Sequence, residues 1–552
     1  MTGSNGLIMK RALAVVLFTC AFASVAFASQ RYLVMTRGPL RESRGVTRSA
    51  YESADRSFDN VDAFAASLSN DEVAAMRHDS GVRFVEPVVE RHIETTIPAP
   101  PHATTSAAIY TNHQTIPWGV DAIHARDVWP LTRGAGVNVA VIDTGIDFTH
   151  PDLKRAYAGG YNTLSPGDPP RDDNFHGTHV AGTIAATDNG FGVLGCAPDV
   201  RLWAVKVLDQ NGNGDSEHVV AGVDWVLSRK KEIGGRWIVN LSLGSVLRSD
   251  IEAAIFARAI DEGVVVVAAS GNSSWALVDY PAGYDGVMAI GAVDENGTAA
   301  VWENRGTISV AGPGVNVLST IRQNLVLVSD IALSDGSVID VTPLTGSPIG
   351  EVHGEYIVCG FGHPSDFPPA VKGKIAVLVR GELTFNEKAR NAKAAGAVAV
   401  IIVSRPGDPD NVNRWSLVDV CDANNVCGPD PAQVAFEWPL TLGVSADQGA
   451  AILNGSATLT MTASTRGQDY LILSGTSMAT PHVAAAAALA WSLVPQLTNI
   501  ELRQAIEGAA HDRGTPGYDS TYGNGSVDAL ATAKLVAPEK FGITPRRRGA
   551  QH

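Results

Sequence analysis

The chain has 552 residues, 45% of them hydrophobic and 18% charged, and a formal net charge of -15. This length allows roughly two or three hydrophobic cores, and the apolar content excludes a disordered protein. Proteins that bind nucleic acid neutralise phosphates with an excess of Lys and Arg, so the acidic balance argues against such a partner. We therefore expect a globular protein of several domains that does not bind nucleic acid.

Residues 1–28 have the features of an export signal. Lys10 and Arg11 precede an apolar run, and a small-x-small triplet at residues 26–28 ends it. The apolar run is shorter than the roughly 20 residues that a membrane-spanning helix needs. We expect its removal, secretion to the extracellular space or the periplasm and cell envelope, and no stable membrane association.

The cysteines that remain suggest different roles. Cys421 and Cys427 are close in sequence between loop-type residues, which makes them candidates for a disulfide in an oxidising compartment. Cys196 lies among apolar residues, and we expect an inert buried thiol there.

Residues 29–94 have the pattern of a small α+β unit. The pattern predicts a strand over Arg31–Thr36, a helix over Val61–Met76 and a second strand over Val82–Ile93. The unit contains no catalytic-looking cluster. A linker rich in Pro, Thr and Ala follows at residues 95–113.

From Gln114 onward, apolar runs alternate with segments of helical spacing. This alternation predicts an α/β fold, a doubly wound parallel sheet with helices on both faces. Ligands of such sheets lie beyond the carboxyl ends of the strands. The expected strands are Val137–Ile142, Arg201–Leu208, Trp237–Leu243, Val264–Ala269 and Val287–Val293, and the expected helices are His179–Ala186, Ser216–Ser228 and Ile251–Glu262.

Polar residues stand where this sheet and its helices end or begin. Asp143 ends the first strand, His176 opens a helix, and Asn272 follows the strand at Val264–Ala269. Ser477 lies in S-G-T-S-M-A-T-P-H, directly before an Ala-rich helix. Together they supply a carboxylate, a base, an amide donor and a nucleophile, which are the parts needed for acyl transfer.

The helix behind Ser477 is suited to negative charge. Its positive dipole end and the N–H of Ser477 can stabilise an oxyanion. Gly475 permits the sharp turn, and Pro481 is expected in the first turn, where a missing N–H has no cost.

Each of these residues also has a simpler interpretation when it is taken alone. Asp143 fits a solvated strand end, Asn272 a turn, and Ser477 a helix cap. His176 and His179 are spaced like half of a metal site, but the segment lacks the glutamate of H-E-x-x-H. The combination of all four residues favours catalysis.

These motifs, in the order Asp143, His176 and Ser477, resemble the subtilisin-like serine proteases (subtilases, peptidase family S8). The resemblance covers roughly residues 114–321 and 468–533. It implies a secreted serine endopeptidase that hydrolyses peptide bonds through an acyl-enzyme. Asp143 would orient His176, His176 would move the proton, Ser477 would attack, and Asn272 with the Ser477 N–H would hold the oxyanion.

The resemblance also implies a groove that binds extended polypeptide substrates by strand addition. The residues that match its two edges are Ser242, Leu243 and Gly244 on one side and Gly212, Asn213 and Gly214 on the other.

Asp279 matches a position at the base of the primary specificity pocket. A carboxylate there would favour Lys or Arg before the scissile bond. The alternative is that the loop length differs and that Asp279 faces solvent.

A structural Ca²⁺ site follows from the resemblance as well, since oxygen ligands suit this hard cation. The alternative is an ordinary polar loop with a solvated Asp152. The positions that match the family's ligands are Gln114, Asp152, Thr187, Asn189, Phe191 and Val193.

The resemblance gives the remaining segments a role. Residues 29–94 would be a propeptide that acts as chaperone and intramolecular inhibitor, with cleavage between Glu94 and His113. The catalytic domain would comprise residues 114–323 and 465–538, followed by a tail at 539–552.

The β-rich block 324–464 resembles a protease-associated (PA) domain, with a helix at Asn386–Ala395 and a strand at Val398–Val403. An alternative function is a catalytically silent exported binding protein that uses this domain. Loss of a catalytic part would favour that alternative, and none is missing.

Overall fold

The computed structural model describes residues 30–93, 97–98, 114–323, 326–334, 336, 338–348, 350–407, 415–421, 427–453 and 460–543. The expected export signal, most of the linker and the end of the tail lie outside these residues. The chain divides into two compact units, one built from residues 30–57 and 63–87 and the other from residues 58–62 and 88 onward. Within the described ranges, no helix is both long and apolar enough to cross a membrane.

The first unit is a four-stranded sheet in the order β2-β3-β1-β4 with two helices. The strands β1 and β3 pair antiparallel, as do β1 and β4. The elements are β1 (Gln30–Thr36), α1 (Gly45–Glu52), β2 (Arg56–Phe58), β3 (Ala63–Leu68), α2 (Asn70–Arg77) and β4 (Val82–Pro87).

The predicted helix over Val61–Met76 is wrong in its first half, which forms β3. Pairing of β3 with β1 buries Phe64 in the small core, and this tertiary contact overrides the helix propensity of the alanines. The helix α2 begins after Ser69, because its hydroxyl and the Glu72 carboxylate form a reciprocal capping box.

The predicted strand over Val82–Ile93 is two strands in different sheets. β4 ends at Pro87, which has no N–H to continue a ladder. β5 (Glu90–Ile93) belongs instead to a three-stranded sheet in the order β10-β5-β12 of the second unit.

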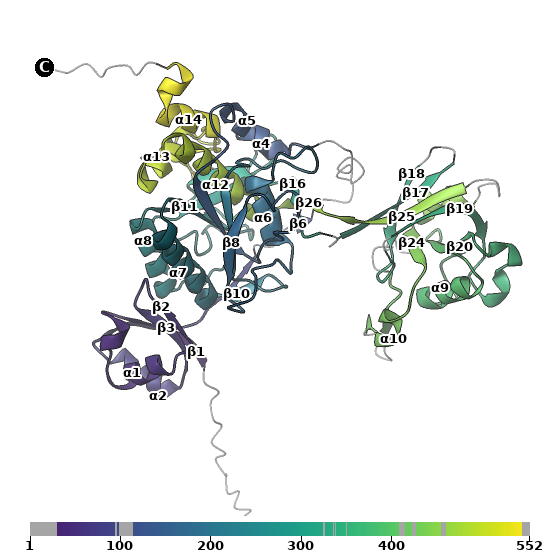
Figure 1. Ribbon diagram of the computed structural model, residues 1–552, viewed down its shortest axis with the longest axis horizontal. Helices are drawn as coiled ribbons and strands as arrows, with labels where there is room; N and C mark the ends of the chain where they lie inside the picture. The colour runs from purple at the N-terminus through teal and green to yellow at the C-terminus, as the bar shows by residue number, and fades with distance from the viewer. Residues whose placement is uncertain are drawn as a thin grey trace, which may run out of the picture. The chain divides into compact units, whose positions relative to one another are not determined.

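A seven-stranded parallel sheet in the order β15-β14-β13-β11-β7-β9-β8 is the centre of the second unit (Figure 1). All five predicted strands are present, whereas the two edge strands β8 and β15 were not predicted. Gly159, Gly160 and Pro313 interrupt the apolar pattern of these edges, where such residues are tolerated. The strands are β7 (Val137–Asp143), β8 (Tyr157–Asn162), β9 (Arg201–Lys206), β11 (Arg236–Leu241), β13 (Val264–Ala269), β14 (Met288–Val293) and β15 (Val310–Pro313).

Helices cover both faces of this sheet, so the predicted doubly wound α/β fold is confirmed. α6 (His176–Ala185) and α12 (Thr476–Leu493) pack together on one face, and α7 (Ser216–Ile233) and α8 (Asp250–Asp261) pack together on the other (Figure 1). α12 is buried along nearly its whole length, because its alanines allow close approach to the strands. The other elements of this part are β6 (Ile97–Pro98), α4 (Trp118–Ala122), α5 (Ala125–Val128), β10 (Asn213–Asp215), β12 (Leu243–Gly244), β16 (Val317–Thr320), β26 (Tyr470–Ser474), α13 (Asn499–Ala509) and α14 (Ala529–Val536).

The block 324–464 is β-rich, as predicted. Six of its strands and β25, which extends beyond residue 464, pair in the closed order β17-β18-β24-β21-β20-β19-β25. The predicted helix lies at α9 (Phe385–Ala394), which a capping box of Thr384 and Glu387 starts. The elements are β17 (Val326–Leu333), β18 (Val338–Pro343), β19 (Gly350–Val358), β20 (Ile375–Val379), α9, β21 (Ala399–Val403), β22 (Asp419–Cys421), β23 (Cys427–Pro429), α10 (Pro431–Val434), β24 (Leu440–Val444), α11 (Ala446–Leu453) and β25 (Thr460–Gln468).

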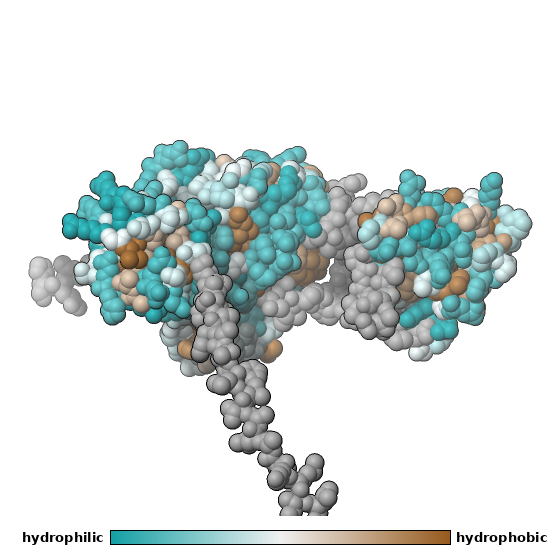
Figure 2. Space-filling model, turned by 90° about the horizontal axis from the view of Figure 1, so that it is seen from below, coloured by the Kyte–Doolittle hydropathy of each residue, from teal (hydrophilic) through white to brown (hydrophobic). Residues whose placement is uncertain are grey.

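The cysteines and the surface complete this description. Cys196 is a buried free thiol whose pKa burial raises, which confirms the prediction for it. β22 and β23 place the backbone of Cys421 opposite that of Cys427, but their side chains lie outside those described, so the disulfide stays a prediction. The face in Figure 2 is mostly hydrophilic, with small scattered hydrophobic patches.

Candidate active site

Three central strands bring polar residues to one edge of the sheet. Leu241 of β11 pairs with Ile142 of β7 on one side and with Ala268 of β13 on the other. Because these strands are parallel, Asp143 at the end of β7 and Ser242 directly after β11 lie at the same edge of the sheet, and the segment that leads to Asn272 starts there.

Asp143 and His176 form a close pair at this edge. His176 Nδ1 lies 2.9 Å from Oδ1 and 3.0 Å from Oδ2 of Asp143, and both side chains are fully buried. The close approach requires glycine next to the histidine, since a Cβ on Gly177 would lie 2.1 Å from the carbonyl oxygen of Gly145. The carboxylate holds the ring with Nε2 directed away from it.

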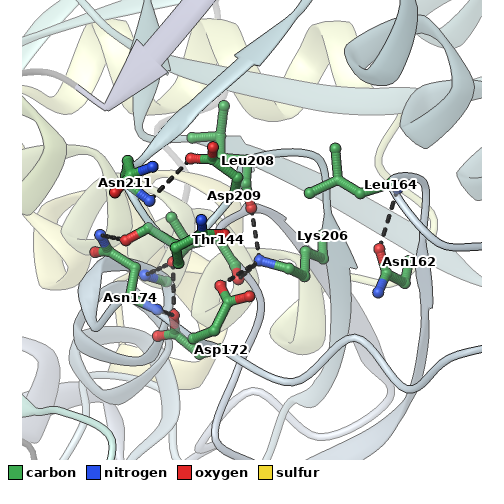
Figure 3. A network of polar contacts seen from close by, with 12 residues as sticks. Thr144, Asn162, Leu164, Asp172, Asn174, Lys206, Leu208, Asp209 and Asn211 are labelled. Carbon is green, nitrogen blue, oxygen red and sulfur yellow. Dashed lines mark hydrogen bonds and ion pairs between the residues drawn. The ribbon is translucent and has the colours of Figure 1, made fainter. Parts of the chain in front are cut away.

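A network of polar contacts fixes the junction between β7 and α6 (Figure 3). The hydroxyl of Thr144 accepts the Gly177 N–H at 2.9 Å and donates to Asp172 at 2.9 Å. Asp172 in turn accepts the N–H and the hydroxyl of Thr178 in the first turn of α6, while burial raises its pKa. Lys206 donates to the Thr144 carbonyl oxygen at 2.8 Å. These residues position Asp143 and His176 without being part of the pair.

Ser477 is the second residue of α12, and its position corrects the expectation for Pro481. The helix begins at Thr476, so Pro481 lies beyond the first turn and inside the helix. Proline removes the N–H that would bind the Ser477 carbonyl in the helical pattern. Ser242 replaces that donor, because its hydroxyl lies 2.8 Å from the Ser477 carbonyl oxygen.

Asn272 faces the same helix start. Its Oδ1 accepts hydrogen bonds from the N–H and the hydroxyl of Thr476, each at 2.9 Å, which fixes the orientation of the amide. A Cβ built on Gly475 would lie 3.2 Å from Asn272 Nδ2 and 3.7 Å from the Ser477 nitrogen. Both nitrogens therefore border one space that glycine keeps open, and the Ser477 N–H has no preceding helical carbonyl to bind. This space suits an oxygen that carries negative charge.

The candidates for nucleophile and base lie on α12 and α6, which pack together, and no hydrogen bond joins their side chains. Ser477 Oγ donates to the Ser242 carbonyl oxygen at 3.0 Å. His176 Nε2 is buried and has no hydrogen-bond partner among the described residues. His179, the other histidine of α6, directs its Nε2 at the carbonyl oxygens of Val317 and Leu471, and burial lowers its pKa to about 3. It is a neutral core donor rather than a partner of His176.

The two predicted edges of the substrate groove are occupied by β5. Gly244 of β12 and Asn213 of β10 both pair with His92, and Leu243 and Gly214 pair with the neighbours of His92. The Gly212 carbonyl oxygen accepts the N–H of Ile93 at 2.9 Å. The structure therefore brings both edges together around one extended chain segment.

Asp279 is buried, so the alternative that it faces solvent is wrong. Its N–H binds the Ser270 carbonyl oxygen at 2.9 Å, next to the Gly271-Asn272 segment. A Cβ on Gly271 would lie 2.5 Å from Asp279 Oδ2 and 2.1 Å from Asn304 Nδ2. The carboxylate thus lies behind the backbone that carries Asn272.

The residues predicted to bind calcium also gather in one place. Gln114 Nε2 donates to the carbonyl oxygens of Thr187 and Val193 at 2.7 and 3.1 Å. Asp152 accepts Asn189 Nδ2 at 2.8 Å and the Val193 N–H at 3.0 Å. Burial raises the pKa of Asp152, so this carboxylate is not solvated and would gain from a cation.

The group around Asp152 contains few charged side chains. Phe191 contributes its N–H to Asn189 Oδ1 at 3.2 Å, while its side chain is exposed. Among the described residues, no three His, Cys, Asp or Glu side chains are grouped to hold a metal, and this group contains only one carboxylate. Its fit to a hard cation therefore rests on backbone and amide oxygens.

Several residues that shape the site could not be predicted from the sequence alone. The hydrogen bonds of these residues join side chains and backbone atoms that meet only in the folded protein. The residues are Thr144, Asp172, Thr476 and Lys206. Thr144 and Thr476 stand next to Asp143 and Ser477, so adjacency in the chain was the one available signal.

The parallel sheet with this edge defines the chain as an α/β protein of the subtilisin-like class. The family model described as the subtilase family matches residues 134–346 and 375–525. The chain belongs to the subtilase family.

The relatives are proteases. The thermostable alkaline protease of Halalkalibacterium halodurans is 36% identical over 338 residues, which are 60% of this chain and 85% of that protein. Subtilisin E of Bacillus subtilis is 36% identical over 272 residues, 48% of this chain and 65% of that protein. The solved structure of a psychrophilic subtilisin-like protease from Pseudoalteromonas sp. AS-11 covers 78% of this chain and 100% of its own, with 29% identity and a TM-score of 0.50. These similarities support a proteolytic function.

Proposed function

We propose that this protein is a secreted serine endopeptidase that uses Asp143, His176 and Ser477. The observation that carries the proposal is the buried Asp143–His176 pair at the sheet edge where α12 presents Ser477. Membership of the subtilase family supports it.

The proposed reaction starts when the Ser477 hydroxyl leaves the Ser242 carbonyl and turns to His176 Nε2. Nε2 accepts the proton while Oγ bonds to the substrate carbonyl carbon, and the carbonyl electron pair moves to the oxygen. Asn272 Nδ2 and the Ser477 N–H donate to that oxygen, and the Asp143 carboxylate stabilises the imidazolium.

Collapse of this intermediate breaks the peptide C–N bond. His176 gives its proton to the leaving nitrogen, which leaves an ester on Ser477. Water then gives a proton to His176 and attacks the ester carbon. When the C–O bond to Ser477 breaks, His176 returns the proton to Ser477 Oγ and the carboxylic acid product leaves.

The chain is proposed to be made as a self-inhibited precursor with residues 29–94 as propeptide. The seating of β5 between β10 and β12 supports this, because a segment in that place excludes a substrate that binds by strand addition. The linker 95–113 would contain the processing site, residues 114–323 and 465–538 the catalytic domain, and residues 539–552 the tail. Block 324–464 is proposed as a PA domain that restricts or guides substrates.

We include a structural Ca²⁺ ion held by Gln114, Asp152, Asn189 and the backbone oxygens of Thr187, Phe191 and Val193. The buried Asp152 carboxylate and the converging carbonyl oxygens support this assignment. The ion would join the N-terminal residues of the catalytic domain to the loop after α6 and takes no part in the chemistry.

Asp279 is proposed to favour Lys or Arg directly before the scissile bond. Its burial behind the Gly271-Asn272 segment supports this, because a buried carboxylate gains from a cationic side chain. Profiling with a peptide library tests it, and equal cleavage after Leu or Phe would refute it.

Labelling with a fluorophosphonate probe tests the proposed nucleophile. We expect labelling of the protein expressed from the full chain and none of its Ser477→Ala variant. His176→Ala should reduce labelling strongly, since the hydroxyl then lacks its base. Labelling of Ser477→Ala at the wild-type level would refute the proposed function.

A further inference from the structure

A fully buried ion pair connects β5 to helix α8 behind the groove. Arg91 Nη2 lies 2.6 Å from Glu252 Oε2 and Arg91 Nε lies 3.2 Å from Oε1, so the contact is bidentate. Both side chains are 0% exposed. The carboxylate outweighs the effect of burial and raises the pKa of Arg91. Such a pair is costly to form without close geometry and costly to break on one side.

Hydrogen bonds from the proposed catalytic domain (residues 114–323 and 465–538, the catalytic part below) fix the Glu252 carboxylate in a position where it can bind a cation. The hydroxyl of Tyr284 donates to Glu252 Oε2 at 2.7 Å, and the Ser249 N–H donates to that hydroxyl at 3.0 Å. Burial and the neighbouring Glu252 charge raise the pKa of Tyr284, so it stays a donor. Among the described residues, Arg91 is the one Lys or Arg that forms an ion pair with Glu252.

Nearby charges do not replace Arg91. Arg248 lies over the Tyr284 ring, 5.6 Å from its centroid, but its guanidinium pairs with Asp250 at 3.0 Å. When β5 leaves the groove, the Glu252 carboxylate therefore remains without a cation from the catalytic part.

The register of β5 gives the position of this contact relative to the reaction centre. Ile93 pairs with Leu243 and His92 with Gly244, so an extended substrate in this register places its next residue opposite Ser242. The Ser242 carbonyl oxygen lies 3.0 Å from Ser477 Oγ, so that residue would carry the attacked carbonyl. A side chain in the place of Arg91 then belongs to the fourth residue before the scissile bond.

We propose that Glu252 and Tyr284 form a subsite that selects arginine at the fourth position before the scissile bond of a polypeptide substrate. This proposal rests on the proposed protease function and adds a specificity-determining residue to it. Arg91 occupies the subsite in the precursor, and the same groove receives substrates once β5 is gone. Arginine fits better than lysine, because its planar fork matches both carboxylate oxygens.

Matched peptide substrates test the subsite with the wild-type protein expressed from the full chain. The peptides differ only at the fourth position, which carries arginine, lysine or citrulline, the uncharged analogue of arginine. We expect kcat/KM for the arginine peptide to exceed that for the citrulline peptide by at least about tenfold, with lysine between them. Equal values for arginine and citrulline, within about twofold, would overturn the proposal.

Variants assign the preference to Glu252. Glu252→Gln keeps the shape and removes the charge, and we expect it to lower the arginine-to-citrulline ratio to near one while the citrulline peptide is still cleaved. Asp261→Asn removes an exposed carboxylate from the same helix and should keep the wild-type ratio. A full arginine preference in Glu252→Gln would overturn the subsite alone, whereas cleavage by Ser477→Ala at the wild-type rate would overturn the protease function itself.

Discussion

The hydroxyl of Ser242 substitutes for the helical N–H that Pro481 lacks, which predicts an energetic coupling between these two positions. In the wild-type chain, Ser242→Ala leaves the Ser477 carbonyl oxygen without a donor in a fully buried place. Leaving such a group unsatisfied costs ~1–3 kcal/mol. In a Pro481→Ala background the new N–H can bind that carbonyl, so the same substitution should cost less.

The loss of the hydroxyl affects a second group in both backgrounds. Asn240 Nδ2 donates to Ser242 Oγ at 3.0 Å, so Ser242→Ala removes that partner whether or not residue 481 is proline. The difference between the two backgrounds cancels this contribution and isolates the Ser477 carbonyl. We expect a coupling free energy of ~1–2 kcal/mol.

The assay is a double-mutant cycle on the free energy of unfolding. All four proteins carry Ser477→Ala, which prevents self-digestion and leaves the backbone carbonyl in place. The transition of the unit that contains α12 is followed by calorimetry and by denaturant. In a unit of this size, ~1 kcal/mol corresponds to roughly one degree in Tm. Equal costs of Ser242→Ala in both backgrounds, within ~0.5 kcal/mol, would refute the reasoning.

Three further predictions follow from burial and close contact. Burial raises the pKa of Glu303 to about 8 from 4.5, so the folded protein binds this proton more tightly than the unfolded chain does. The resulting stabilisation, up to ~5 kcal/mol, is complete below pH 4.5 and is lost as the pH rises from there through about 8. The Tm of Glu303→Gln should therefore decrease less between pH 6 and pH 9.5 than the Tm of the wild type. An identical decrease in both proteins would contradict this. Chelation of calcium should lower the Tm of the Ser477→Ala protein more at pH 8 than at pH 5, because the raised pKa of Asp152 means that acid neutralises this carboxyl. A chelator that leaves the Tm unchanged at pH 8 would refute the proposed calcium ion. Gly177→Ala should reduce kcat/KM by ~100-fold, since its Cβ would meet the Gly145 carbonyl oxygen at 2.1 Å, whereas Gly508→Ala in α13, with open space around it, should leave it unchanged.

The central strands could be predicted because they are continuous apolar runs. Val264–Ala269 has its predicted bounds, and Val137–Ile142 differs from β7 by the addition of Asp143. Edge strands lack this signal, since β8 contains adjacent glycines and most of its residues are only partly buried. The first half of the helix expected at Val61–Met76 is a strand for a related reason. Its alanine-rich segment pairs with β1, which is distant in sequence, and this pairing decides its secondary structure.

The candidate site was predicted better than the contacts that position it. Asp143, His176, Asn272 and Ser477 stand in recognisable local motifs, and the sheet brings them to one edge. The partnership of Arg91 with Glu252 joins residues 161 positions apart through a strand that was expected in a different sheet. The spacing of apolar and polar residues within a short segment contains no information about a contact between residues so far apart in the sequence.

Under the proposed function, β5 and the substrate bind to the same two strands, β10 and β12, so one binding surface governs both the release of the propeptide and the recognition of substrates. A change in the groove that strengthens its hold on an extended chain also strengthens its hold on residues 90–93 of the same molecule. A change that tightens substrate binding therefore slows the release of residues 90–93. The rate of activation and the affinity for substrate cannot be changed independently by substitutions in this groove.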